Sequence, residues 1–125
     1  MKKLNLKKYK KFLEEKVVSL ATASKNAKPN LICVEVNKII NNQLLISNNY
    51  FKKTLTNLKE NNKIALTAIN QGKFLQFKGL AKYHSSGKYL NLIKKLPTNK
   101  NYSPRGALLI KIKEIYDLDN LKKIY

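Results

Sequence analysis

Short segments rich in β-branched and aliphatic residues, separated by turns of a few polar residues, constrain the fold of this chain most. The tightest turn is Asn41-Asn42, which lies between the expected strands 30–38 and 43–47. Two strands joined by so short a turn pair antiparallel, and Asn tolerates the backbone conformation that such turns need. The same pattern predicts four more strands, at 17–23, 63–70, 73–84 and 106–115.

Helical spacing of apolar residues occurs outside these strands. We expect helices at 4–16 and 50–60, a short helix opened by Ser85-Ser86-Gly87, a loop at 96–105 and a closing piece at 117–125. Strand and helix do not alternate regularly, which argues against a parallel doubly wound sheet. The predicted fold is therefore mainly β: a six-stranded antiparallel barrel with a few short helices, closed or nearly closed because closure removes exposed edges. Residues 1–125 are expected to form one domain.

The formal net charge of +19 comes from 26 basic and 7 acidic residues, and Arg105 is the single arginine. A basic surface attracts phosphates, so one hypothesis is a nucleic-acid-binding barrel without a redox cofactor, in which Tyr50, Phe51, Phe74 and Phe77 would stack on bases. The other hypothesis is a codon bias that enriches Lys, Asn and Ile together. Proteins that bind nucleic acids usually use arginine as well, so the bias is favoured and nucleic acid is not the expected partner.

Other features narrow the class of protein. No apolar run approaches the ~18 residues of a membrane helix, and no apolar stretch follows the basic N-terminus, so we expect a cytoplasmic protein without membrane contact. A single cysteine, Cys33, excludes an intrachain disulfide, and no cluster has the spacing of metal ligands. The single histidine, His84, cannot form a triad with neighbours in sequence.

The segment 47–58 carries the most specific chemistry, because a strand, a polar turn and a helix start follow each other there. A helix N-terminus offers unpaired backbone N–H groups and a partial positive charge. Lys52, Lys53 and Thr54 would add cations and a hydroxyl, and together these groups form a phosphate site. The alternative is that Thr54 only caps the helix while the lysines are solvated.

Four motifs in this order resemble one family over residues 12–118. They are Leu20-Ala21-Thr22 in the opening strand, Lys28-Pro29-Asn30 before the second strand, the segment 57–66 (NLKENNKIAL), and Gly79-Leu80-Ala81. Their order and spacing resemble the pyridoxamine-phosphate oxidase-like, flavin mononucleotide (FMN)-binding split-barrel superfamily, and especially its small FMN-binding proteins. The resemblance implies a homodimer with the flavin at the subunit interface, although members of this fold also use a deazaflavin or haem.

The resemblance also implies a set of cofactor-binding residues. Lys53 and Thr54 would bind the FMN phosphate, and the flavin ring and ribityl chain would lie beside Ser47, Asn48 and Asn49. The strand residues that typically face the ring are Ile32, Cys33, Val34 and Glu35. Gln76 could contribute from either subunit, and Tyr50, Tyr102 or Tyr125 could stack on the ring. Catalytic residues stay unassigned.

Two departures from the family pattern limit the activity that the resemblance implies. Ile32 stands near the place where the oxidase has a basic residue, and the chain ends without the oxidase's C-terminal segment bearing Arg and His. Pyridoxamine oxidation is therefore not expected. The resemblance instead implies an FMN-binding oxidoreductase or electron carrier, with an unidentified small molecule or protein as its electron partner.

Overall fold

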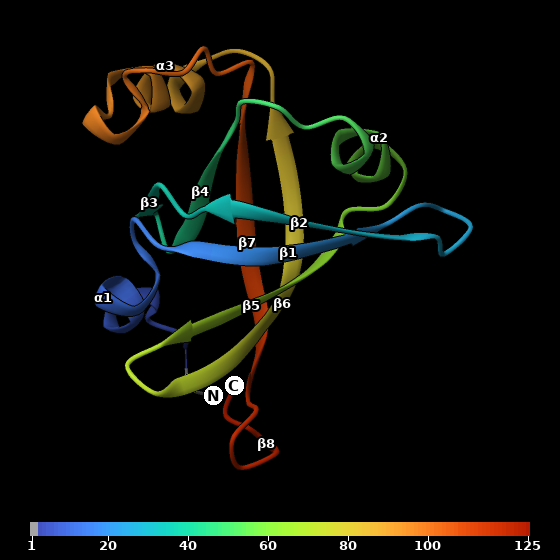
Figure 1. Ribbon diagram of the computed structural model, residues 1–125, viewed down its shortest axis with the longest axis vertical. Helices are drawn as coiled ribbons and strands as arrows, with labels where there is room; N and C mark the ends of the chain where they lie inside the picture. Colours follow the sequence, from blue (N-terminus) through green and yellow to red (C-terminus); the bar gives the residue numbers. More distant parts are fainter. Residues whose placement is uncertain (1–2) are drawn as a thin grey trace.

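The computed structural model describes residues 3–125, and within them one antiparallel sheet of eight strands curls around a core (Figure 1). The strands are β1 (Val17–Ala23), β2 (Pro29–Glu35), β3 (Lys38–Ile40), β4 (Gln43–Asn48), β5 (Lys63–Asn70), β6 (Lys73–His84), β7 (Gly106–Asp117) and β8 (Lys122–Lys123). Five helical segments accompany them: η1 (Leu6–Tyr9), α1 (Lys10–Leu13), α2 (Lys53–Glu60), α3 (Lys88–Lys95) and η2 (Pro97–Asn99). None of the helices within 3–125 is long and apolar enough to cross a bilayer.

The sheet order β2-β1-β5-β6-β7-β4-β3 brings its two ends together, because β2 and β3 are consecutive in the chain. Only Val36 and Asn37 separate these two strands. The Val36 N–H donates to the Lys16 carbonyl on the β1 side, and the Asn37 N–H donates to the Leu45 carbonyl on β4, 2.9 Å away. The chain thus exchanges one neighbour for the other within two residues, which closes a split barrel. The predicted fold class, a mainly β antiparallel split barrel, is confirmed, but the sheet formed within residues 3–125 has eight strands where six were expected.

Alternating side chains build the core from the inner faces of the strands, as a half-buried sheet requires. Leu20, Leu66, Phe77 and Ile110 are almost fully buried inside the barrel. At one end η1 and α1 cover the barrel, where the Tyr9 ring meets Phe77 edge to face at 5.5 Å. A second, smaller core lies under α3 and consists of Leu45, Ile93, Ala107 and Leu109.

Several element boundaries differ from the sequence prediction. The expected strand 30–38 is two strands, because Val36 and Asn37 bond to opposite neighbours. The expected helix 4–16 is a short 3₁₀ turn followed by one α-helical turn, and it ends before Glu15, whose φ of 61° is left-handed. The helix expected at 50–60 starts at Lys53, and the closing piece 117–125 contributes β8, which pairs with β7.

Candidate functional site

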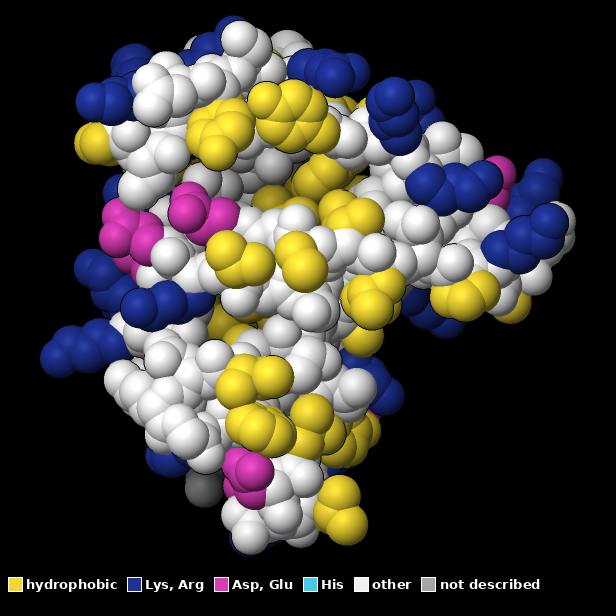
Figure 2. Space-filling view, in the orientation of Figure 1, with side chains coloured by type: hydrophobic (Ala, Val, Ile, Leu, Met, Phe, Trp, Pro, Cys, Tyr) yellow, Lys and Arg dark blue, Asp and Glu magenta, His cyan; other side chains and the backbone are white. Residues whose placement is uncertain are grey.

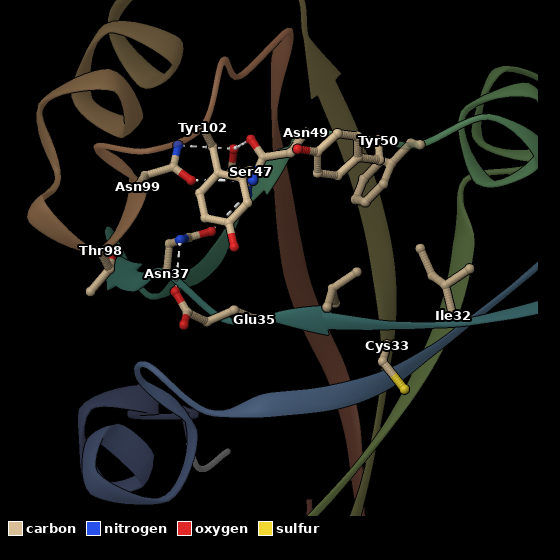
Figure 3. A pocket seen from close by; sticks show the side chains of 12 residues that line it. Ile32, Cys33, Glu35, Asn37, Ser47, Asn49, Tyr50, Thr98, Asn99 and Tyr102 are labelled. Atoms are coloured by element: carbon tan, nitrogen blue, oxygen red, sulfur yellow. Dashed lines mark hydrogen bonds between the residues drawn. The ribbon is translucent and has the colours of Figure 1, made fainter.

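A cleft of about 440 Å³ opens between β2, the loop that follows β4, and the η2 loop (Figure 3). This volume falls within the range of small-molecule and cofactor sites. Both apolar and polar side chains line it: Ile32, Cys33, Val34, Glu35, Asn37, Ser47, Asn49, Tyr50, Phe51, Thr98, Asn99 and Tyr102. These residues come from three separate segments of the chain. The fold brings them together, and no single local motif contains the site.

A hydrogen-bonded ring of amides and one hydroxyl fixes the polar wall of the cleft. The Ser47 hydroxyl donates to Asn49 Oδ1 at 2.7 Å, Asn49 Nδ2 donates to Asn99 Oδ1 at 3.2 Å, and Asn99 Nδ2 donates back to Ser47 Oγ at 3.2 Å. Asn99 is buried, so water could not replace the hydrogen bonds that its side chain makes in this ring. The ring ties the loop after β4 to η2, which holds two walls of the cleft in register.

Asn48 does not line the cleft but anchors the loop that does. Its Nδ2 donates to the Tyr83 hydroxyl at 2.7 Å, and its Oδ1 accepts from the Phe51 N–H at 2.7 Å. Its side chain is almost completely buried, and a Cβ at Gly106 would overlap Tyr83. The absence of a side chain at Gly106 therefore leaves room for the tyrosine that holds Asn48.

Aromatic side chains form part of the rim of the cleft, and Figure 3 shows Tyr50 on the side toward α2 and Tyr102 beside Asn99. Tyr50 is 73% exposed and meets Tyr102 edge to face, with ring centroids 6.2 Å apart. Phe51 lies deeper and is buried. Exposed rings at a cleft provide stacking surface for a planar ligand, while the third tyrosine considered from the sequence, Tyr125, does not line this cleft.

Glu35 is the only charged side chain among the twelve that line this cleft in the described chain. Its Oε2 accepts a hydrogen bond from Asn37 Nδ2 at 3.2 Å, and Asn37 Oδ1 accepts from the Ser47 N–H at 2.8 Å. Burial raises the pKa of the Glu35 carboxyl above its ordinary value, and the negative charge of Glu15 raises that pKa further. Figure 3 shows Glu35 beside Asn37, with Thr98 and Asn99 drawn near them in this view.

The start of α2 lies directly after the cleft residues Tyr50 and Phe51. The residue that precedes the helix, Lys52, makes no side-chain cap, so the first backbone N–H groups of α2 receive no hydrogen bond from a capping side chain in the part of the chain described. Lys53 is exposed, whereas Thr54 is buried and its hydroxyl accepts a hydrogen bond from Asn30 Nδ2 at 3.1 Å. Two lysines and open amides therefore adjoin the cleft.

The cleft brings together most of the candidate residues named from the sequence. Six of them line it: Ile32, Cys33, Val34, Glu35, Ser47 and Asn49. Lys53 and Thr54 lie at the adjacent helix start, Asn48 lies behind the loop, and Gln76 lies on β6, paired with Thr67 and Tyr116 and outside the cleft lining.

Sequence reasoning missed Asn37, Thr98 and Asn99. Asn37 fell inside an expected strand, and the other two lie in a loop that is about fifty residues from Ser47 in the chain. The Pro and Asn content of segment 96–105 was the only available indication, and it marks loops in general.

Comparison with known proteins gives a consistent result. Residues 6–119 match the family model described as pyridoxamine 5′-phosphate oxidase. An uncharacterized protein of Methanocaldococcus jannaschii is 39% identical over 114 residues, which span 86% of this chain and 76% of that protein.

Two solved structures extend the comparison. HupZ of Group A Streptococcus superposes with a TM-score of 0.84 at 18% identity, covering 98% of this chain and 100% of that chain. An FMN-binding protein of Syntrophomonas wolfei superposes with a TM-score of 0.69 at 22% identity, covering 81% and 76%. At these identities, the likeness shows the fold alone.

Proposed function

The chain belongs to the pyridoxamine 5′-phosphate oxidase family, and we propose that it is an FMN-binding flavoprotein that acts as an oxidoreductase or an electron carrier. The observation that carries this proposal is the amphipathic cleft of about 440 Å³, whose lining residue Phe51 is followed in the chain by the uncapped start of α2. One end of such a site suits a planar ring, and the other suits a phosphate. The similar fold of an FMN-binding protein adds support.

The residues present fit the chemical groups of FMN. Ile32, Val34 and Phe51 offer apolar contacts to a ring system, and Tyr50 and Tyr102 offer aromatic faces. Asn49 and Ser47 offer a polar edge for the ribityl hydroxyls. When bound, a flavin supplies reversible one- and two-electron chemistry, while the protein binds it, orients it and controls access to it.

The phosphate would bind at the start of α2. Lys52 and Lys53 supply positive charge, and the first amides of α2 supply donors. Thr54 is expected to act indirectly, because its buried hydroxyl is engaged with Asn30 and fixes α2 against β2. A deazaflavin or haem is the alternative cofactor for this fold. FMN is favoured over haem because the cleft has an uncharged aromatic rim and the helix start beside it suits a phosphate.

We further propose that the protein is a homodimer, as the family resemblance implies. Apolar side chains on the outside of β2, β1, β5 and β6 form what we call the outer face, defined by Val17, Leu31, Cys33, Ile69 and Phe74. Figure 2 shows apolar side chains running along this side of the molecule, beside the cleft. Leu31 is 67% exposed and Ile69 is 66% exposed. Covering the outer face would therefore bury apolar surface, which is favourable.

The nucleic-acid hypothesis receives little support from the cleft. Lysines surround the molecule, but none is among the side chains that line the cleft in the described residues. Phe51 and Phe77 are buried and cannot stack on bases, which removes half of the proposed aromatic platform.

An absorbance titration with FMN tests the proposal. The purified protein is mixed with FMN and desalted, and the expected result is retained flavin at about one per subunit. Lys53→Ala should weaken FMN binding about tenfold, because it removes a charge-assisted contact with the phosphate. Lys59→Ala is the matched control, since it removes the same charge from the far end of the same helix. If wild-type protein retains no flavin at any concentration, the FMN proposal is wrong.

A further inference from the structure

The charge inside the cleft is opposite to the charge of the chain. The whole sequence carries 26 basic and 7 acidic residues. Among the twelve side chains that line the cleft, with only residues 3–125 described, there is no Lys or Arg and one carboxylate, Glu35. A codon bias toward lysine affects the surface in general, so it does not account for a cleft that carries a single negative charge.

Glu35 is held in the cleft wall by a defined partner. Asn37 donates to its carboxylate, and Asn37 is itself fixed by the Ser47 N–H. Glu35 has no salt bridge, because the one ion pair found in residues 3–125 joins Lys123 and Glu114. The side chain lines the cleft although many lysines elsewhere could have neutralised it.

A carboxylate in this place distinguishes between ligand groups. It accepts hydrogen bonds and cannot donate them when ionised. It attracts N–H and O–H donors. It repels a second carboxylate next to it, and this repulsion weakens the binding of ligands that carry one. Partial burial strengthens both effects, since solvent screens the charge less.

From this arrangement we propose that Glu35 sets the ligand specificity of the cleft: it accepts an uncharged ring edge that donates a hydrogen bond and excludes ligands that bring a carboxylate to that end. The proposal rests on the proposed function for the placement of phosphate at α2, which leaves the ring end of the ligand near Glu35. A flavin meets this requirement, because its ring is uncharged and carries an imide N–H. Haem oriented with its two carboxylates toward Glu35 does not, because like charges repel.

Glu35→Gln isolates the charge from the shape, because the side chain keeps its size and an oxygen that Asn37 can bond. The experiment titrates wild type and this variant separately with FMN and with haemin, following flavin fluorescence and haem absorbance. The variant should bind FMN about fivefold more weakly and haemin about tenfold more tightly. Opposite changes for the two ligands are diagnostic, since loss of folding would weaken both.

Glu15→Gln is the matched control. It removes the same charge from a neighbouring acidic residue that is exposed and outside the cleft lining. Its affinities for both ligands should stay within about twofold of wild type, which separates local contact from the long-range field.

The proposal is wrong if haemin binds wild type and Glu35→Gln equally, or binds neither. That result leaves the FMN function intact when both proteins retain FMN. If wild type binds no FMN, the proposed function fails separately. A tenfold gain in haemin affinity in Glu35→Gln would then still support the exclusion of carboxylates.

Discussion

Asn48 is the residue on which the position of the cleft loop most depends. Asn48→Ala removes both the hydrogen bond to Tyr83 and the one that satisfies the Phe51 N–H. Because the Phe51 N–H is buried and the Tyr83 hydroxyl is partly buried, we expect a loss of about 2–4 kcal/mol in the free energy of unfolding, measured by urea denaturation. Flavin affinity should fall as well, since Tyr50 and Phe51 line the cleft.

Tyr83→Phe provides the graded comparison for this prediction. It keeps the ring and removes only the hydroxyl that accepts from Asn48, so the loss should be about 1 kcal/mol. Equal, negligible effects of both substitutions would show that the loop is held by other contacts.

Glu35 gives a pH dependence whose sign follows from its environment. Burial, and then Glu15, raise the carboxyl pKa in the folded protein above the value of 4.5 of an unperturbed carboxyl. The folded state therefore binds the proton more tightly than the unfolded state, and ionisation of Glu35 lowers stability as pH rises through this window. Glu35→Gln should be more stable than wild type at about pH 7.5, with the difference vanishing toward about pH 4. Urea midpoints at both pH values test this, and a gain that is independent of pH would contradict it.

Local sequence does not distinguish the roles of neighbouring polar residues. Ser47, Asn48 and Asn49 are consecutive, and the resemblance places all three beside the flavin. In the folded chain Ser47 and Asn49 line the cleft, whereas Asn48 turns to Tyr83, which is 35 residues away. The difference depends on which strand lies behind the loop, and that is a property of the tertiary structure.

At the scale of elements, periodicity identified each long strand because alternation of apolar side chains reflects a sheet with one buried face. It could not reveal the break at Val36 and Asn37, since apolar residues continue on both sides, at Val34 and Ile39. The break is an exchange of hydrogen-bond partners between β1 and β4. Such an exchange produces no signal in the local amino-acid composition. It follows from the closure of the sheet.

The ends of the helices were predicted less well than the strands for a similar reason. The apolar residues Leu6, Tyr9, Phe12 and Leu13 pack on one end of the barrel, and this packing needs only two short turns. Helical spacing therefore persists where the helix itself is short. Before α2, Tyr50 and Phe51 line the cleft instead of forming a helical turn, and the helix begins at Lys53.

For the whole molecule, charge and apolar surface are segregated. Lysines lie around the periphery in Figure 2, whereas the outer face and the cleft are apolar or weakly acidic. A strongly positive protein resists self-association unless it has a surface on which charge is absent. The outer face is such a surface, and a homodimer that covers it would bring the cleft of one subunit close to its partner.

Leu31→Lys tests this arrangement. It introduces a charge into the outer face, and burying an unpaired charge at an interface is strongly unfavourable. Size-exclusion chromatography with light scattering should show a dimer for wild type and a monomer for the variant. Cys33 gives a second readout in flavin-free protein, because it is an exposed residue where the outer face meets the cleft, and its thiol should react with a maleimide at least about tenfold faster when that face is uncovered.

Leu121→Lys is the matched control, because Leu121 is 90% exposed in the turn before β8 and is not one of the residues that define the outer face. It makes the same substitution and the same charge change, so a general effect of added charge would dissociate both variants alike. A dimer that persists in Leu31→Lys with unchanged Cys33 reactivity would place the subunit contact on another surface. A monomeric wild type would show that the homodimer proposal is wrong.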